Sequence, residues 1–181
     1  MISEIESSLI ASCLKGKRHA QYSLYHSYCD AMYNVCFRLM GNEGEAEDAL
    51  QESFVFIFKN LESFRGESSL GAWIKRIVIN HCLNQLKKRK LVFEEMQGPY
   101  DNYISEGGDE DEHSQFEVDR IRKAIMKLPD GYRQVLTLYL IEGYDHAEIA
   151  EILGIQETGS KSQYSRARSR LREILNEHVK S

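Results

Sequence analysis

Residues that break helices are scarce in this chain, and so are long apolar runs. Only 2 of the 181 residues are proline, and long stretches also lack glycine, a composition that favours helices. No apolar run approaches the roughly 18 residues that a membrane-spanning helix needs. The N-terminal residues MISEIESSLI lack the basic region of a signal peptide. We therefore expect a helical, cytoplasmic protein without membrane insertion.

The cysteines lack the spacing of a zinc site. Cys13, Cys29, Cys36 and Cys82 form no CxxC pair, so a structural metal is only weakly indicated. Cys29 and Cys36 could share one helical face near His26, as half of a metal site. We favour the alternative, in which the thiols are small buried groups in a reducing compartment. We expect no metal and no cofactor.

Negative charge is concentrated in one segment. Residues 91–119 hold ten acids and no lysine or arginine, whereas residues 1–90 carry a net charge of +2 and residues 120–181 a net charge of +3. The acidic segment also contains Gly-Pro and Gly-Gly pairs, which together with its charge indicate a disordered linker. We therefore expect an N-terminal domain over 1–90, a flexible linker over 91–114 and a C-terminal domain over 115–181. The overall charge of -5 does not exclude a nucleic-acid partner.

The sequence shows no recognisable catalytic arrangement. Neither a nucleophile with its base nor a phosphate-binding loop appears in it. Residues 109–112 form a cluster of carboxylates, but a flexible linker cannot hold them in a fixed geometry. We therefore set an enzyme aside.

Apolar residues recur every three or four positions, and no alternation typical of β-strands persists. The pattern predicts an all-α fold with four helices on each side of the linker. The N-terminal helices are expected near 3–15, 18–40, 43–62 and 68–89, with Ser68 or Ser69 capping the fourth. The C-terminal helices are expected near 116–128, 131–142, 145–153 and 157–177.

Two successive helices of the N-terminal part have opposite charge. Residues 43–62 carry six acids and one base, whereas residues 65–90 carry seven bases and one acid. The two helices either pair with each other or serve two partners, a basic protein surface for the first and nucleic acid for the second. Phe64 and Trp73 lie beside the basic stretch, as suits unstacked single-stranded bases, although core packing accounts for Trp73 equally well.

The C-terminal part contains the pattern of a helix-turn-helix. Ala150 is small enough for two helices to cross closely, and Gly154 can take the positive φ that ends the first of them. The second helix carries polar and basic residues largely off its core face: Lys161, Ser162, Gln163, Ser165, Arg166, Arg168 and Arg172. Such a helix fits the major groove of DNA. A solvated basic face is the alternative, but the helix-glycine-helix pattern favours DNA binding.

Two stretches together resemble the extracytoplasmic-function (ECF) sigma factors of the sigma-70 family. AEDALQESFVFIFKNLESFRGESSLGAWIKRIVINHCLNQLKKRK (46–90) is similar to region two of that family. AIMKLPDGYRQVLTLYLIEGYDHAEIAEILGIQETGSKSQYSRARSRLREIL (124–175) is similar to region four. The resemblance implies a subunit that binds bacterial core RNA polymerase, through the β′ clamp helices and the β flap, and directs promoter-specific initiation. It also implies promoter DNA and a cognate anti-sigma factor as partners.

The resemblance further assigns three sets of residues. Four should dock on the β′ clamp helices: Asp48, Gln51, Glu52 and Phe56. A second set should capture the non-template strand of the minus-ten element: Arg65, Ser68, Ser69, Trp73, Lys75, Arg76, Asn80, Asn84, Lys87, Lys88 and Arg89. A third should read the minus-35 element as a duplex: Thr158, Lys161, Ser162, Gln163, Ser165, Arg166 and Arg168. The acidic linker resembles the connector that threads the path later taken by RNA.

One position departs from the family pattern. Thr158, Gly159 and Ser160 stand where the family usually has Gly-Thr-Val, so Ser160 replaces an aliphatic anchor. This predicts a looser start to the recognition helix, and a gain of about 1 kcal/mol in stability for Ser160→Val if the site is buried.

A stand-alone helix-turn-helix regulator with an N-terminal sensor or dimerisation domain is the alternative function. Such a regulator needs neither an acidic docking helix nor a basic melting helix, and this chain has both. The two-part match therefore favours the sigma factor.

Overall fold

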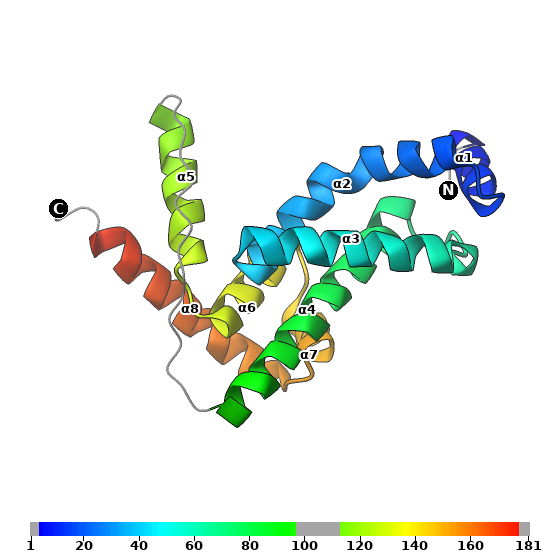
Figure 1. The fold of residues 1–181 in the computed structure, drawn as a ribbon. Helices are drawn as coiled ribbons and strands as arrows, with labels where there is room; N and C mark the ends of the chain where they lie inside the picture. The colour runs from blue at the N-terminus through cyan, green and yellow to red at the C-terminus, as the bar shows by residue number, and fades with distance from the viewer. Residues whose placement is uncertain (1–3, 97–112, 178–181) are drawn as a thin grey trace. The chain divides into compact units, whose positions relative to one another are not determined.

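A computed structural model describes the backbone of residues 4–96 and 113–177 (Figure 1) and the side chains of residues 4–88 and 118–176. The chain divides into two compact units, Met1–Glu95 and Met96–Ser181. Most of the predicted linker, residues 97–112, lies outside the described residues, as does the side chain of Arg89.

The described residues form helices and no strands, which confirms the predicted all-α fold. The first unit contains α1 (Glu4–Leu14), α2 (Arg18–Met40), α3 (Glu43–Asn60), the short 3-10 helix η1 (Leu61–Ser63) and α4 (Leu70–Met96). The second contains α5 (His113–Met126), α6 (Asp130–Leu140), α7 (His146–Leu153) and α8 (Glu157–Glu177).

Caps set the ends of helices in the first unit. Gly41 ends α2 with a φ of 78°, and the Asn42 side chain accepts a hydrogen bond from the Glu45 N–H at the start of α3. The Ser69 hydroxyl accepts one from the Ala72 N–H, at 3.2 Å, as α4 begins. This bond confirms the predicted cap and assigns it to Ser69.

Helix α4 continues to Met96, past the expected end at residue 89. Residues 91–96 contain neither glycine nor proline, so nothing in their backbone chemistry stops the helix. The charge of the segment suggested a linker, but charge alone does not end a helix.

Each unit has its own apolar core. In the first, large side chains from α2, α3, α4 and η1 are buried; they include Leu24, Leu39, Ile57, Leu61, Leu70 and Ile74. Cys13, Cys36 and Cys82 are buried among them as free thiols, the environment expected of small apolar groups. No group of three metal-binding side chains occurs in the part of the chain that the structure describes.

The second unit packs α5 and α6 against α8. Its core contains Ala124, Ile125, Leu128, Leu136, Ala167 and Ile174. Arg133 is buried at the start of α6, where it donates to the Leu128 carbonyl at 2.9 Å and to Asp130 at 2.6 Å. The bond to Leu128 anchors α6 to the residues before it, and α6 packs against α8.

Candidate protein and nucleic-acid interfaces

Helix α3 exposes acidic and aromatic side chains together. Its inner side is buried through Ala46, Ala49, Leu50, Phe54 and Ile57. The four predicted docking residues are all exposed, and their spacing places them along one side of the helix: Asp48, Gln51, Glu52 and Phe56. Val55 beside them is 54% exposed and Phe56 is 49% exposed. Exposed apolar side chains rimmed by charge are typical of a protein-binding surface.

Glu52 also contacts the neighbouring helix. Its Oε2 atom accepts hydrogen bonds from His81 Nε2 at 2.8 Å and from Gln85 Nε2 at 2.9 Å, both on α4. These bonds, that of His81 first, lower the pKa of the Glu52 carboxyl below its ordinary value. The acidic helix α3 and the basic helix α4 therefore contact each other at this point. The two α4 residues involved, His81 and Gln85, were not singled out from the sequence.

Helix α4 carries a row of exposed polar side chains. Arg76, Asn80, Asn84 and Lys87 are exposed at helical spacing and so form one row along α4. Arg65, Ser68, Ser69 and Lys88 are exposed too, and Lys75 is half-buried. The described members of the predicted minus-ten set thus lie on α4 and on the loop that precedes it.

Trp73 is half-buried against Phe64, with the two ring centroids 5.4 Å apart. Its ring therefore has a packing partner within the fold, and part of its surface is accessible beside the basic row. Both interpretations from the sequence, core packing and base stacking, are compatible with this position.

The helix-turn-helix is formed by α7 and α8. Asp145 and Glu148 make a capping box at the start of α7, each side chain bonding the other's backbone N–H at 2.8 Å. Gly154 ends α7 in the left-handed region, with a φ of 67°. The Ile155 N–H then donates to the Ala150 carbonyl at 3.0 Å. The predicted turn is therefore confirmed.

Helix α8 separates a core side from a basic side. Ala167 and Ile174 are buried in the core. The exposed members of the predicted minus-35 set are Thr158, Lys161, Ser162, Ser165, Arg166 and Arg168. Gln163 is half-buried, so less of it is available to a partner.

Two of the exposed cations already have weak partners. Lys161 Nζ lies 2.6 Å from Glu157 Oε1, one turn earlier, and the Arg168 guanidinium lies 5.7 Å from the centre of the Tyr164 ring. Exposed contacts of this kind contribute about 1 kcal/mol or less. Both side chains can therefore turn to a phosphate or a base at low cost.

Ser160 is a polar anchor for the start of α8. The residue is wholly buried, and its hydroxyl lies 2.9 Å from His146 Nδ1 at the start of α7. The His146 ring stacks on Tyr139 at 4.4 Å between centroids. A hydrogen bond between the two helices thus replaces the aliphatic contact whose loss the sequence suggested would loosen the helix.

This bond reverses the effect expected of Ser160→Val. Valine would leave His146 Nδ1 without its partner in a half-buried place, so we expect the C-terminal unit to lose about 1 kcal/mol of stability. Thermal unfolding of the full chain would measure the change. The double variant Ser160→Val with His146→Leu should recover most of the loss, because both polar partners are then absent. A higher melting temperature for Ser160→Val alone would contradict the anchor.

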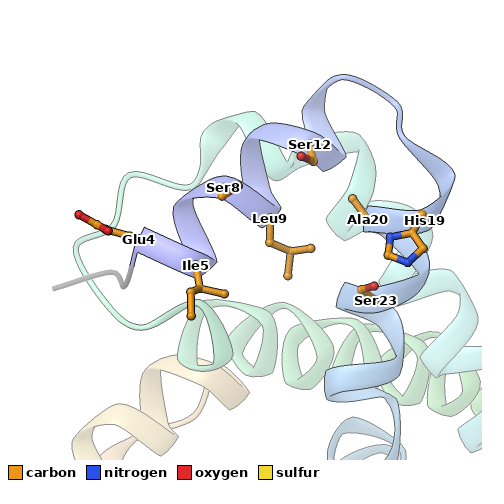
Figure 2. Close-up of a pocket in the computed structure, with 8 residues that line it drawn as sticks. All are labelled: Glu4, Ile5, Ser8, Leu9, Ser12, His19, Ala20 and Ser23. Carbon is orange, nitrogen blue, oxygen red and sulfur yellow. The ribbon is translucent and has the colours of Figure 1, made fainter.

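An open groove between α1 and α2 holds none of the predicted site residues. Figure 2 shows its lining, which comes from both helices: Glu4, Ile5, Ser8, Leu9, Ser12, His19, Ala20 and Ser23. The lining mixes small polar and aliphatic side chains and has no cluster of charge. We assign the groove no role in the site.

Two family models match the chain, one in each unit. Residues 24–92 match sigma-70 region 2, and residues 119–171 match sigma-70 region 4. The order of the two regions is the one that the sequence motifs predicted. The described helices contain no segment that is long and apolar enough to span a membrane.

Curated relatives extend the match over nearly the whole chain. The ECF RNA polymerase sigma factor SigW of Bacillus subtilis is 33% identical over 171 residues, which cover 89% of this chain and 91% of the relative. The ECF RNA polymerase sigma factor SigM of Mycobacterium tuberculosis is 28% identical over 171 residues, 94% of this chain and 84% of the relative. A two-part helical protein with a helix-turn-helix and both sigma-70 regions is a sigma factor by class. This chain belongs to the family of ECF RNA polymerase sigma factors.

Solved structures share the fold. The sigma factor RpoE of Bartonella quintana, solved with the anti-sigma factor NepR, matches with a TM-score of 0.63 and 24% identity over 86% of this chain and 96% of that chain. CnrH, solved with the cytosolic domain of CnrY, matches with a TM-score of 0.53 and 23% identity over 93% of this chain and 95% of that chain.

Proposed function

We propose that this chain is a dissociable subunit of bacterial RNA polymerase that directs promoter-specific initiation of transcription. The observation that carries the proposal is the presence of both sigma-70 regions on one chain, each within its own compact unit. The chain acts in the cytoplasm by binding and positioning, and the catalytic centre belongs to the polymerase.

Helix α3 is the proposed attachment to core polymerase. Asp48 and Gln51 supply exposed polar groups, and Phe56 supplies an apolar anchor that water solvates poorly. An acidic surface of this kind complements a basic one, which steers the encounter and excludes acidic partners. We assign the β′ clamp helices as the partner surface, and we propose that the C-terminal unit contacts the β flap.

The exposed row on α4, with the loop from Arg65 to Leu70, is the proposed contact to the minus-ten element. Cations hold the backbone of the displaced strand, while the amides of Asn80 and Asn84 can bond base edges. A base turned out of the stack could rest against the accessible part of Trp73, because aromatic stacking is worth about 1–3 kcal/mol per base.

Helix α8 is the proposed reader of the minus-35 element. Its exposed residues from Thr158 to Arg168 present hydroxyls and cations on the side away from the core. The capping box fixes the start of α7, and the bond between Ser160 and His146 fixes the start of α8 relative to α7. A fixed recognition helix can place arginine and lysine against guanine edges in the major groove.

We also propose a cognate anti-sigma factor as a partner. The two solved structures named above are complexes of a sigma factor with an anti-sigma protein. A partner of this kind would keep the chain from the polymerase until a signal releases it.

Run-off transcription tests the proposal. Bacterial core RNA polymerase would be mixed with a library of duplexes of randomised sequence, with and without the chain, and the transcripts sequenced. We expect transcripts from a selected pair of elements only when both components are present. Equal output with and without the chain would contradict the function and favour a stand-alone regulator.

A further inference from the structure

We propose that Glu52 is a positioning residue for DNA opening, because its carboxylate fixes α4 on α3 through His81 and Gln85. The inference rests on the proposed function and deepens it: Glu52 then acts through the minus-ten helix in addition to lying on the docking helix. The family resemblance predicts only a docking role for this residue.

The contact joins helices that are far apart in sequence. Glu52 and His81 are separated by 29 positions and Glu52 and Gln85 by 33, yet both donors reach the same carboxylate oxygen. Gln85 Nε2 also lies 3.3 Å from His81 Nε2, so the three side chains form one cluster. A carboxylate that accepts two directed bonds specifies the rotation of α4 about its own axis as well as its distance from α3.

The cluster is adjacent to the proposed DNA-binding amides. His81 follows Asn80 directly, and Gln85 follows Asn84, so each bonded residue is next to an exposed amide. Successive residues on a helix point about 100° apart. A rotation of α4 that breaks the bonds to Glu52 therefore turns Asn80 and Asn84 by the same angle.

The environment of Glu52 keeps this contact available at neutral pH. The hydrogen bonds from His81 and then Gln85 lower the pKa of its carboxyl, so the acceptor stays ionised. The Glu52 side chain is 62% exposed, which means that the bonds compete with water. A small energy of this kind matters for orientation and much less for global stability.

Conservative substitutions of Glu52 distinguish a positioning role from a docking role that depends on its charge. Glu52→Gln removes the charge but keeps a carbonyl oxygen that can accept from His81 and Gln85. Glu52→Ala removes both. If Glu52 served the polymerase mainly through its charge, Glu52→Gln and Glu52→Ala would weaken core affinity equally. If Glu52 positions α4, Glu52→Gln should open the promoter at a rate close to that of the wild type. His81→Ala should then slow opening as much as Glu52→Ala does.

The experiment measures two quantities for each full-length variant with core polymerase: the affinity for core, by fluorescence anisotropy, and the rate of open-complex formation on a selected promoter. The variants are Glu52→Ala, Glu52→Gln, His81→Ala, Gln85→Ala and the double Glu52→Ala with His81→Ala. Glu62→Ala is the matched control, because Glu62 is an exposed acid of the same unit outside the cluster. Melting temperatures show whether each variant folds.

We expect Glu52→Ala and His81→Ala each to slow opening by about three- to tenfold, with the double variant no slower than either. On a promoter saturated with core, Glu52→Gln should open faster than Glu52→Ala, and Glu62→Ala should match the wild type. Core affinity should stay within about twofold of the wild type in His81→Ala, Gln85→Ala and Glu62→Ala, because these residues lie outside the predicted docking set. Gln85→Ala should also slow opening, so the test remains valid if His81→Ala fails to fold. Additive effects on opening, or an opening rate at saturating core that is as slow in Glu52→Gln as in Glu52→Ala, would overturn the inference. A wild-type chain that opens no promoter with core would overturn the proposed function as well.

Discussion

Replacing Asp48 by lysine and Phe56 by serine should abolish transcription that depends on core polymerase and leave the fold intact. Both residues are exposed on α3, so neither substitution opens a cavity. Substitutions at such positions usually change stability by about 0.5 kcal/mol or less. The reversed charge meets a basic partner unfavourably, and the lost aromatic ring removes the largest apolar group on this face.

The expected loss of core affinity is large. A central interface residue typically contributes about 2–4 kcal/mol, and a reversed charge adds repulsion. We therefore expect about a hundredfold weaker binding to core, measured by anisotropy, with a melting temperature close to that of the wild type. The charge change belongs at Asp48, because reversal at Glu52 would also break the bonds to α4.

Glu62→Lys is the control for this first prediction. It makes the same change of charge on an exposed residue of η1, outside the α3 face, so its core affinity should match that of the wild type. A double Asp48→Lys, Phe56→Ser variant that binds core normally would show that the docking surface lies elsewhere.

The second large effect is expected in the recognition helix. Arg166→Ala and Lys161→Ala should each weaken binding to a minus-35 duplex by about 1–3 kcal/mol, the range for loss of a direct base contact. Both side chains are exposed on α8. The ion pair between Lys161 and Glu157 is lost as well, but an exposed pair at this spacing contributes little to stability.

Core attachment should be unchanged in these two variants, because the proposed docking surface on α3 is in the other unit and the substituted side chains are assigned to DNA. Two affinities are measured for each variant: that of the complex of chain and core polymerase for the minus-35 duplex, and that of the chain for core polymerase. Arg122→Ala provides the comparison, since Arg122 is an exposed arginine of the same unit on α5, where it pairs with Asp119 at 3.2 Å. Normal transcription by both α8 variants from a promoter that requires its minus-35 element would show that the recognition helix is misassigned.

The helices were predictable because apolar periodicity and capping are local. All eight expected helices are present in the described residues, and Gly154 ends its helix as predicted. The end of α4 was not predictable from charge, since residues 91–96 are compatible with both a helix and a linker. Helix propensity and charge favour different structures there, and only the folded chain shows which one forms.

The side-chain bonds between helices were not predictable from one sequence. His146 and Ser160 are 14 positions apart, and Glu52 and His81 are 29 apart. Spacing along one helix says nothing about which side chains two different helices bring together. As a result, the sequence predicts a missing anchor at Ser160 and a docking acid at Glu52, and it gives no sign of the hydrogen bonds that these two residues make. For both residues, the hydrogen-bond partner says more about the residue's role than its exposure does.

We propose that the two units act together only on the polymerase. The regions before and after the acidic segment are only mildly basic, at +2 and +3, and the segment between them carries a charge of -10. Each unit alone therefore has little electrostatic attraction for phosphate. Core polymerase, by holding both units on one promoter, would convert two weak contacts into one avid complex.

Binding of the chain to a selected promoter duplex, with and without core polymerase, tests this claim most directly. A gel-shift titration at a fixed salt concentration would compare that duplex with one whose two elements are scrambled. We expect the chain alone to bind both duplexes weakly and without preference, and to bind the selected duplex tightly once core is added. Tight, sequence-specific binding by the chain alone, with no response to core, would contradict it.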